Sequence, residues 1–204
     1  EAGATLGELL NYTLQHNLWI PQLPGYPNIT IGGAVAANSH GKSCAHHGTI
    51  RNSIEKILLF HKTHGWIELS KEKNNEIFDL TIGGIGLTGT IVKVTFKLQE
   101  IENSSFITRK IFTSSIKETV DSVLNETSSK ENFTYSWNRA DGINNLGKGI
   151  IFTNSVDKVT SKDLKSDKKI FKNFLKSNFT FWNNFTLKLA NIAFINFHKL
   201  KKNS

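Results

Sequence analysis

The fold is decided by the stretch Ile31-Gly32-Gly33-Ala34-Val35-Ala36-Ala37-Asn38-Ser39-His40-Gly41-Lys42. Glycine has no side chain, so the backbone at Gly32-Gly33 can approach a ligand closely or adopt dihedral angles closed to other residues. Successive backbone N–H groups in such a turn can hold phosphate oxygens. The small residues that follow predict a short helix against which a flat molecule could lie. Two glycines alone are as typical of a tight turn, so the interpretation depends on spacing.

The spacing excludes the common nucleotide-binding loops. The order of glycines does not fit Gly-x-Gly-x-x-Gly. Gly41-Lys42-Ser43 resembles the end of a P-loop, but the first glycine of that motif would fall at Ala36. Instead, Gly25 precedes Gly32 by seven residues, and a second glycine-rich stretch follows at residues 83–89.

These stretches together resemble the FAD-contacting segment of the vanillyl-alcohol-oxidase (PCMH-type) superfamily. The lysine of His40-Gly41-Lys42 makes the chain similar, within that superfamily, to the decaprenylphosphoryl-β-D-ribose 2′-oxidases. One departure is that Ser43, Cys44 and Ala45 stand before His46-His47, where the family has a histidine pair directly behind His-Gly-Lys. The residues that carry the resemblance are Leu23-Pro24-Gly25, 30–42, Gly48-Thr49-Ile50, Asn52, 83–91 and, more loosely, Tyr135-Ser136-Trp137, Asp141, 146–149, Phe185-Thr186-Leu187-Lys188, Asn191 and Phe197-His198-Lys199.

The resemblance implies an α+β fold in two parts. Residues 1–101 would form the C-terminal half of a PCMH-type FAD-binding domain, with a mixed or antiparallel sheet flanked by helices. Residues 102–204 would form the N-terminal part of an α+β substrate domain, which would be incomplete. The chain would then be a piece of a longer enzyme, without the upstream pyrophosphate loop, and inactive alone.

The resemblance also implies the site. FAD would be bound non-covalently, and His40 and Lys42 would be the catalytic residues. Lys42 would bind the phosphate of the substrate or stabilise negative charge on the reduced flavin. The alternatives are a buried, hydrogen-bonded histidine at His40 and a solvated lysine at Lys42. The cofactor-binding residues would be Gly25, Thr30, Ile31, Gly32, Gly33, Ala37, Asn38, Ser39, His40, Gly89 and Ile91.

No metal site is expected. Cys44 is the single cysteine, which excludes an internal disulfide and a cysteine-rich metal centre. The spacing of His40, Cys44 and His46-His47 fits no standard zinc pattern.

The function implied is FAD-dependent oxidation of a sugar hydroxyl, namely the 2′-OH of a polyprenylphosphoryl ribose in the epimerisation that supplies cell-wall arabinan. A sugar-1,4-lactone or alditol oxidase is the alternative among flavoenzymes. The net charge of +8 leaves one alternative of another class, a basic non-catalytic module that binds anions or nucleic acid.

The partners that the resemblance implies are a lipid-linked or small sugar and an NAD-dependent reductase, with no nucleic acid. We expect a cytoplasmic location, or one peripheral to the inner membrane. The sequence contains no signal segment and no apolar run near the roughly 20 residues that span a bilayer.

Periodicity predicts the elements. Thr5, with Glu8 three residues later, is typical of the start of a helix, here over residues 4–18. A hairpin is expected from strands at 54–60 and 66–69, and the alternation over 90–98 predicts a half-buried strand. The polar stretch Glu100–Ser105 is a candidate domain boundary. Beyond it we expect strands at 106–112, 133–137 and 148–153, helices at 115–128 and 179–200, and an exposed loop at 157–169.

Overall fold

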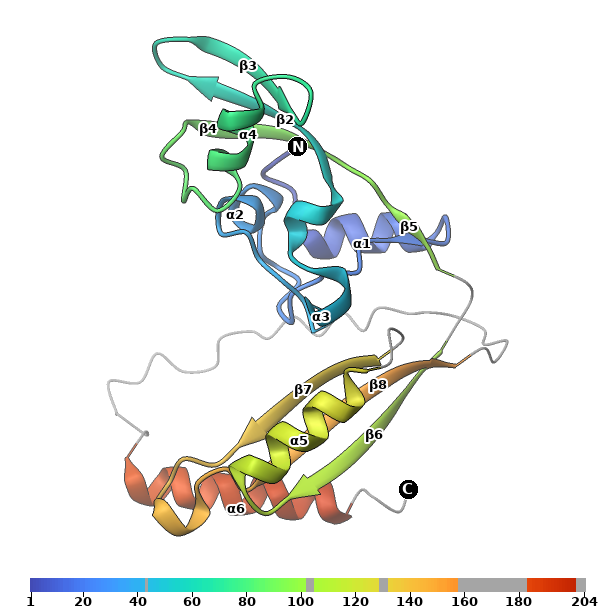
Figure 1. Ribbon diagram of the computed structural model, residues 1–204, viewed down its shortest axis with the longest axis vertical. Helices are drawn as coiled ribbons and strands as arrows, with labels where there is room; N and C mark the ends of the chain where they lie inside the picture. The colour runs from blue at the N-terminus through green and yellow to red at the C-terminus, as the bar shows by residue number, and fades with distance from the viewer. Residues whose placement is uncertain (43, 102–104, 129–131, 158–182, 201–204) are drawn as a thin grey trace. The chain divides into compact units, whose positions relative to one another are not determined.

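The computed structural model describes residues 1–42, 44–101, 105–128, 132–157 and 183–200. The chain forms two compact units, one from Glu1–Ser105 and the other from Phe106–Asp157 together with residues 183–200 (Figure 1). Each unit combines helices with a small sheet, so the fold is α+β as predicted. The expected loop at 157–169 lies, beyond Asp157, outside the described residues.

The first unit is built around an antiparallel sheet of order β3-β2-β4. Its elements are α1 (Leu6–Leu14), β1 (Leu18–Trp19), α2 (Ile31–Ala36), α3 (Cys44–His47), a 3-10 turn (Ile50–Ser53), β2 (Ile54–His61), β3 (Gly65–Ser70), α4 (Asn75–Thr81), β4 (Thr90–Phe96) and β5 (Gln99–Glu100).

The hairpin of β2 and β3 confirms the sequence prediction, since Phe60 pairs with Trp66 and the turn consists of Lys62, Thr63 and His64. The alternation over β4 is also confirmed. Its residues alternate between half-buried and exposed from Val92 onward. An irregularity in β4, where Val92 is skipped between the pairs Leu58–Lys93 and Leu59–Ile91, lets Ile91 pack against the core as well. The sheet therefore offers one apolar face to the helices.

Helix α1 begins as predicted but ends earlier. The Thr5 hydroxyl accepts the Glu8 N–H, and the Glu8 carboxylate accepts the Thr5 N–H at 2.8 Å. The predicted end at residue 18 is wrong, because Asn17 has a left-handed φ of 55° that breaks the helix. Leu18–Trp19 then pairs with Gln99–Glu100, a contact 80 residues away that no local pattern signals.

The hydrophobic core of this unit lies between the sheet and the helices. Side chains of α2 enter it, and Phe78 of α4 is fully buried. Because α2 is only six residues long, its packing against this core holds it in place more than its own hydrogen bonds do. The buried members are Leu6, Ile31, Ala34, Val35, Ile50, Ile54, Ile57, Leu59, Leu69, Phe78 and Ile82.

The second unit is a three-stranded sheet of order β6-β8-β7 between two helices (Figure 1). The predicted strands and helices are all present, with small differences at their ends. Ser115 caps α5 by accepting the Glu118 N–H. The elements are β6 (Ser105–Thr113), α5 (Ile116–Glu126), β7 (Asn132–Asn138), a 3-10 turn (Ile143–Asn145), β8 (Gly149–Asp157) and α6 (Asn184–Leu200).

The two faces of this sheet contact different helices. On one face, the Thr119 hydroxyl of α5 donates to Asn138 Oδ1 of β7. On the other, Trp137 lies against Phe194 of α6, with ring centroids 4.6 Å apart. Among the helices that the structure describes, none is long and apolar enough to cross a membrane.

Candidate functional site

Helix α2 has a buried side and a side without bulk. Ile31, Ala34 and Val35 point into the core, whereas Gly33 and Ala37 are exposed. Thr30 caps the helix, and its hydroxyl accepts the Gly33 N–H at 3.2 Å. The exposed side therefore carries only hydrogen and methyl groups, which lets a planar molecule approach the backbone closely.

The backbone N–H groups at the start of α2 already donate hydrogen bonds within the chain. Those of Ile31 and Gly32 donate to carbonyls of the N-terminal segment, each at 2.8 Å, and that of Gly33 donates to the cap. The acceptors are the Ala4 and Ala2 carbonyls and the Thr30 hydroxyl. The idea that successive N–H groups of this turn hold phosphate oxygens is therefore wrong, because none of the three is available. Any ligand contact here would involve carbonyls and apolar surface.

Two unsatisfied oxygens lie just beyond α2. Asn38 has a left-handed φ of 46°, which ends the helix and turns the chain. Asn38 Oδ1 and Ser39 Oγ are buried, and neither has a hydrogen-bond partner among the described residues. Because a buried polar atom without a partner costs free energy, such atoms indicate a place where a polar ligand or water completes the site.

The glycine-rich stretch 83–89 lies directly beside this end of α2. The Gly83 N–H donates to the Val35 carbonyl and the Ile85 N–H donates to the Ala36 carbonyl, both at 3.0 Å. The two glycine-rich stretches quoted from the sequence are therefore brought together by backbone hydrogen bonds. Ile85 and Leu87 project from the loop and are 73% and 91% exposed.

Gly89 and Ile91 lie where this loop enters β4. A Cβ at Gly89 would lie 2.7 Å from the Phe60 carbonyl oxygen, so the residue must be small for β4 to pair with β2. The Ile91 side chain packs against the core opposite Leu59. Both residues thus have structural reasons for their identity in addition to the predicted cofactor contact.

His40 and Lys42 are presented at the surface beyond Asn38 and Ser39. His40 is exposed, so the alternative of a buried histidine is wrong; its Nδ1 lies 3.1 Å from the Gly41 carbonyl oxygen. The Lys42 side chain is exposed overall, yet partial loss of water around its ammonium group lowers its pKa. A lysine of lowered pKa next to a histidine is typical of a chemically active surface.

Gly41 holds this segment against the chain at Gln22 and Leu23. A Cβ at Gly41 would lie 2.6 Å from the Leu23 carbonyl oxygen. The buried Gln22 side chain donates to the His47 carbonyl at 2.7 Å and accepts the Ser53 hydroxyl at 2.8 Å. Sequence reasoning missed Gln22, because both of its partners are more than 20 residues away. At Gly25, by contrast, a Cβ would meet nothing within 4 Å.

Arg51 is a second residue that sequence reasoning missed. Its guanidinium bonds the Asp79 carboxylate and also donates to the Asp79 and Ile82 carbonyls, both at 2.9 Å. It thereby fixes the end of α4 and the start of the glycine-rich loop. No feature of the local sequence distinguishes this arginine from a solvated one.

His46 and His47 follow Lys42 in the short helix α3. Burial and the nearby His46 lower the pKa of His47. Within the described ranges, no three His, Cys, Asp or Glu side chains come together as ligands.

Asp141 and Asn191, which resemble the family more loosely, are hydrogen-bonded to each other in the second unit. Asp141 accepts both Arg139 Nε (2.9 Å) and Nη2 (2.6 Å), and it is also hydrogen-bonded to Asn191 of α6. These bonds, Arg139 first, hold the pKa of Asp141 at about 2 although its buried position would raise it. The pair fixes the β7–β8 hairpin to α6. Sequence reasoning named Asp141 and Asn191 but not Arg139.

The first unit fits FAD on its own geometry. A side-chain-poor helix face, two unsatisfied buried oxygens and a lysine of lowered pKa follow one another along residues 33–42. The helix face suits a flat ring, the two oxygens suit the edge of a heterocycle that carries N–H donors, and the lysine suits a negative charge.

Comparison with known proteins agrees with this fit. Residues 1–69 match a family described as FAD binding domain. A decaprenylphosphoryl-beta-D-ribose oxidase of Mycolicibacterium smegmatis is 32% identical over 199 residues, which are 89% of this chain and 43% of that protein. L-gulonolactone oxidase of Bos taurus is 26% identical over 67% of this chain and 30% of its own length. L-galactono-1,4-lactone dehydrogenase 2, mitochondrial, of Oryza sativa subsp. japonica is 28% identical over 67% and 23%.

The chain spans less than half the length of these curated relatives. The matched domain and the site described above both lie within this chain. FAD is the cofactor that this domain binds. Along most of its length the chain is thus similar to a PCMH-type FAD-binding oxidoreductase.

Proposed function

We propose that the protein is an FAD-dependent oxidoreductase that oxidises a sugar hydroxyl. The observation that carries the proposal is the sequence of features along α2 and beyond it: an exposed face of small residues, then the unsatisfied oxygens of Asn38 and Ser39, then His40 and Lys42. Residues 1–101 would supply this wall of the FAD site and residues 102–204 would belong to the substrate domain.

FAD, when bound, accepts the hydride that leaves the carbon of the oxidised hydroxyl. Asn38 and Ser39 would accept hydrogen bonds from the cofactor and fix its orientation. In the tautomer in which Nδ1–H of His40 donates to the Gly41 carbonyl, Nε2 is free to accept a hydroxyl proton. Lys42 would hold a negative charge of the substrate or offset charge that develops on the ring.

The substrate in this proposal is a polyprenylphosphoryl ribose, oxidised at its 2′-OH. Its support is the similarity to the decaprenylphosphoryl-beta-D-ribose oxidase of Mycolicibacterium smegmatis together with Lys42, whose charge suits a phosphate group. The names of the lactone-oxidising relatives support a sugar-1,4-lactone as the second candidate. Non-covalent FAD, an NAD-dependent reductase as partner and a cytoplasmic or membrane-peripheral location complete the proposal.

The test is to mix the full-length flavoprotein with each substrate without oxygen and to measure reduction of the flavin as a loss of its absorbance. Polyprenylphosphoryl ribose should bleach the flavin, and L-gulono-1,4-lactone should not. Bleaching by the lactone alone would replace the first candidate with the second. A purified protein that takes up no FAD would overturn both.

A further inference from the structure

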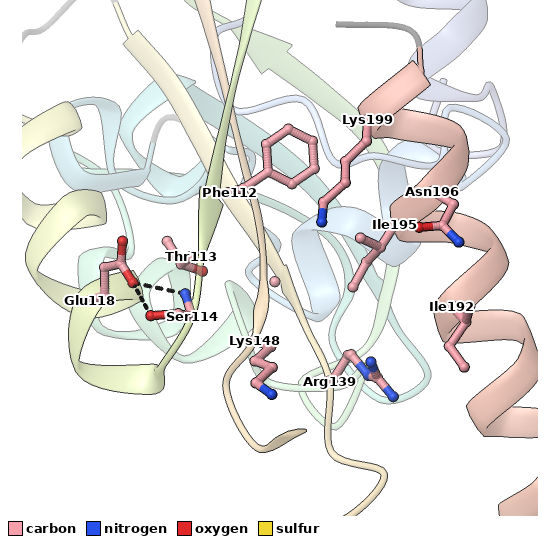
Figure 2. A pocket seen from close by; sticks show the side chains of 11 residues that line it. Phe112, Thr113, Ser114, Glu118, Arg139, Lys148, Ile192, Ile195, Asn196 and Lys199 are labelled. Atoms are coloured by element: carbon pink, nitrogen blue, oxygen red, sulfur yellow. Dashed lines mark hydrogen bonds between the residues drawn. The ribbon is translucent and has the colours of Figure 1, made fainter. Parts of the chain in front are cut away.

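The second unit contains a cavity of about 430 Å³, and its lining residues all belong to that unit (Figure 2). It lies where the end of β6, the start of β8 and the last turns of α6 come together. Its lining includes the basic side chains of Arg139, Lys148 and Lys199. The lining also includes Phe112, Ile192 and Ile195, so basic and apolar surfaces face the same space.

Two of the cations are neighbours across the β7–β8 hairpin. Arg139 and Lys148 follow the last strand pair, Asn138 with Gly149, and the Arg139 N–H donates to the Lys148 carbonyl at 2.8 Å. Since the Asn138 side chain bonds Thr119 of α5, the next pair points to the opposite face, toward α6. Like charges directly opposite each other in an antiparallel pair are destabilising.

The third cation comes from α6. Lys199 reaches toward Phe112, and its Nζ lies 5.9 Å from the ring centroid. In Figure 2, Arg139 and Lys148 lie side by side below it. Positive charge therefore approaches the cavity from the hairpin and from the helix.

The carboxylates nearby do not neutralise the lysines. Asp141 is committed to Arg139. Glu118 also lines the cavity and keeps its negative charge there, but its carboxylate is engaged by the Ser114 N–H at 2.8 Å and the Ser114 hydroxyl at 2.6 Å and not by a lysine. In the part of the chain that the structure describes, neither Lys148 nor Lys199 forms an ion pair with a carboxylate. Two uncompensated ammonium groups beside a cavity favour an anionic ligand.

We propose that this cavity binds a phosphate ester whose substituent is an apolar chain. Lys148 and Lys199 hold the phosphate oxygens, Asn196 can donate a hydrogen bond, and Phe112, Ile192 and Ile195 contact the chain. The assignment of this ester to the lipid-linked sugar rests on the proposed function. The argument from the charges and apolar side chains of the cavity is independent of it. Lys42 belongs to the other unit and does not line this cavity.

The experiment is calorimetric titration of the FAD-loaded, full-length protein with decyl phosphate below its micellar concentration. Inorganic phosphate and decyl maltoside are titrated in parallel, because they carry the charge and the chain separately. We expect decyl phosphate to bind, and each of the other two to bind at least about tenfold more weakly, as loss of one set of contacts implies.

The variants Lys148→Gln and Lys199→Gln should each weaken decyl phosphate binding about tenfold. Lys188→Gln is the matched control. Lys188 is exposed and belongs to α6, as Lys199 does, but it does not line the cavity. Thermal unfolding of each variant shows whether it folds as the wild type does, so that weaker binding can be assigned to the lost charge. Equal binding by all three variants, or binding of decyl maltoside as tight as that of decyl phosphate, would overturn the site.

The outcomes for the site and for the proposed function are distinguishable. Lysine-dependent binding of decyl phosphate without flavin reduction by the lipid-linked ribose leaves the site and removes that substrate. Flavin reduction by the lipid-linked ribose with an unchanged KM in both lysine variants leaves the function and removes the assignment of the ester to this substrate, whereas the decyl phosphate titration decides the site itself.

Discussion

Gly41 shows how closely the backbone segments of the candidate site are packed. The change Gly41→Ala places a methyl group 2.6 Å from the Leu23 carbonyl oxygen, a backbone atom that cannot turn aside. We expect a loss of about 1–3 kcal/mol in the free energy of unfolding, as for other overpacked sites. Chemical denaturation measures the loss. Gly3→Ala is the control, because a Cβ there meets nothing within 4 Å and should leave stability nearly unchanged.

Lys42 can be tested separately from cofactor binding. Lys42→Met should lower kcat/KM about 100-fold, as removal of a charge-stabilising donor does, while FAD remains bound. Because burial lowers the pKa of Lys42, the wild-type rate should fall at a lower alkaline pH than an ordinary lysine would give. Lys42→Arg keeps its charge and should lose this alkaline limb. An unchanged rate in Lys42→Met at neutral pH would remove Lys42 from the chemistry.

At the scale of elements, the Arg139–Asp141 pair joins a hairpin to a helix and makes that contact sensitive to acid. The pKa of Asp141 is about 2 in the fold and 3.8 ordinarily, so the pair stabilises the fold above the ordinary value. Stability should fall as the pH drops from about 5 toward 2. Asp141→Asn should lower the Tm at pH 7 and flatten this dependence. Asp121→Asn, in an exposed pair with Lys117, should do neither.

The sequence could predict most elements, but not all of their ends. Alternation identified β4 and the capping pair Thr5–Glu8 identified the start of α1, because both signals are local. The end of α1 was predicted wrongly, since Asn17 and the pairing of β1 with a distant strand decide it. Gln22, Arg51 and Arg139 escaped prediction for the same reason: their roles depend on contacts that form only in the fold.

At the scale of the whole molecule, the two units should respond differently to the cofactor. FAD binding should slow amide hydrogen exchange at residues 31–42 and 83–89, which lie together beside α2. Exchange in β7 and β8 should change little, because these strands belong to the other unit. At 100 times Kd, the cofactor would add about 2.7 kcal/mol to the stability of the state that binds it. Mass spectrometry of exchanged peptides measures both; equal protection in the two units would contradict the assigned site.

The hydrogen bonds from Gly83 and Ile85 to the end of α2 also affect the order in which the parts of the first unit fold. They join segments almost 50 residues apart, and the intervening chain must first form the β2–β3 hairpin and α4. Contacts that close such long loops form slowly compared with local helices and hairpins. The flavin pocket would therefore mature after the local helices and the hairpin during refolding, and appearance of bound flavin would lag behind the return of this local secondary structure.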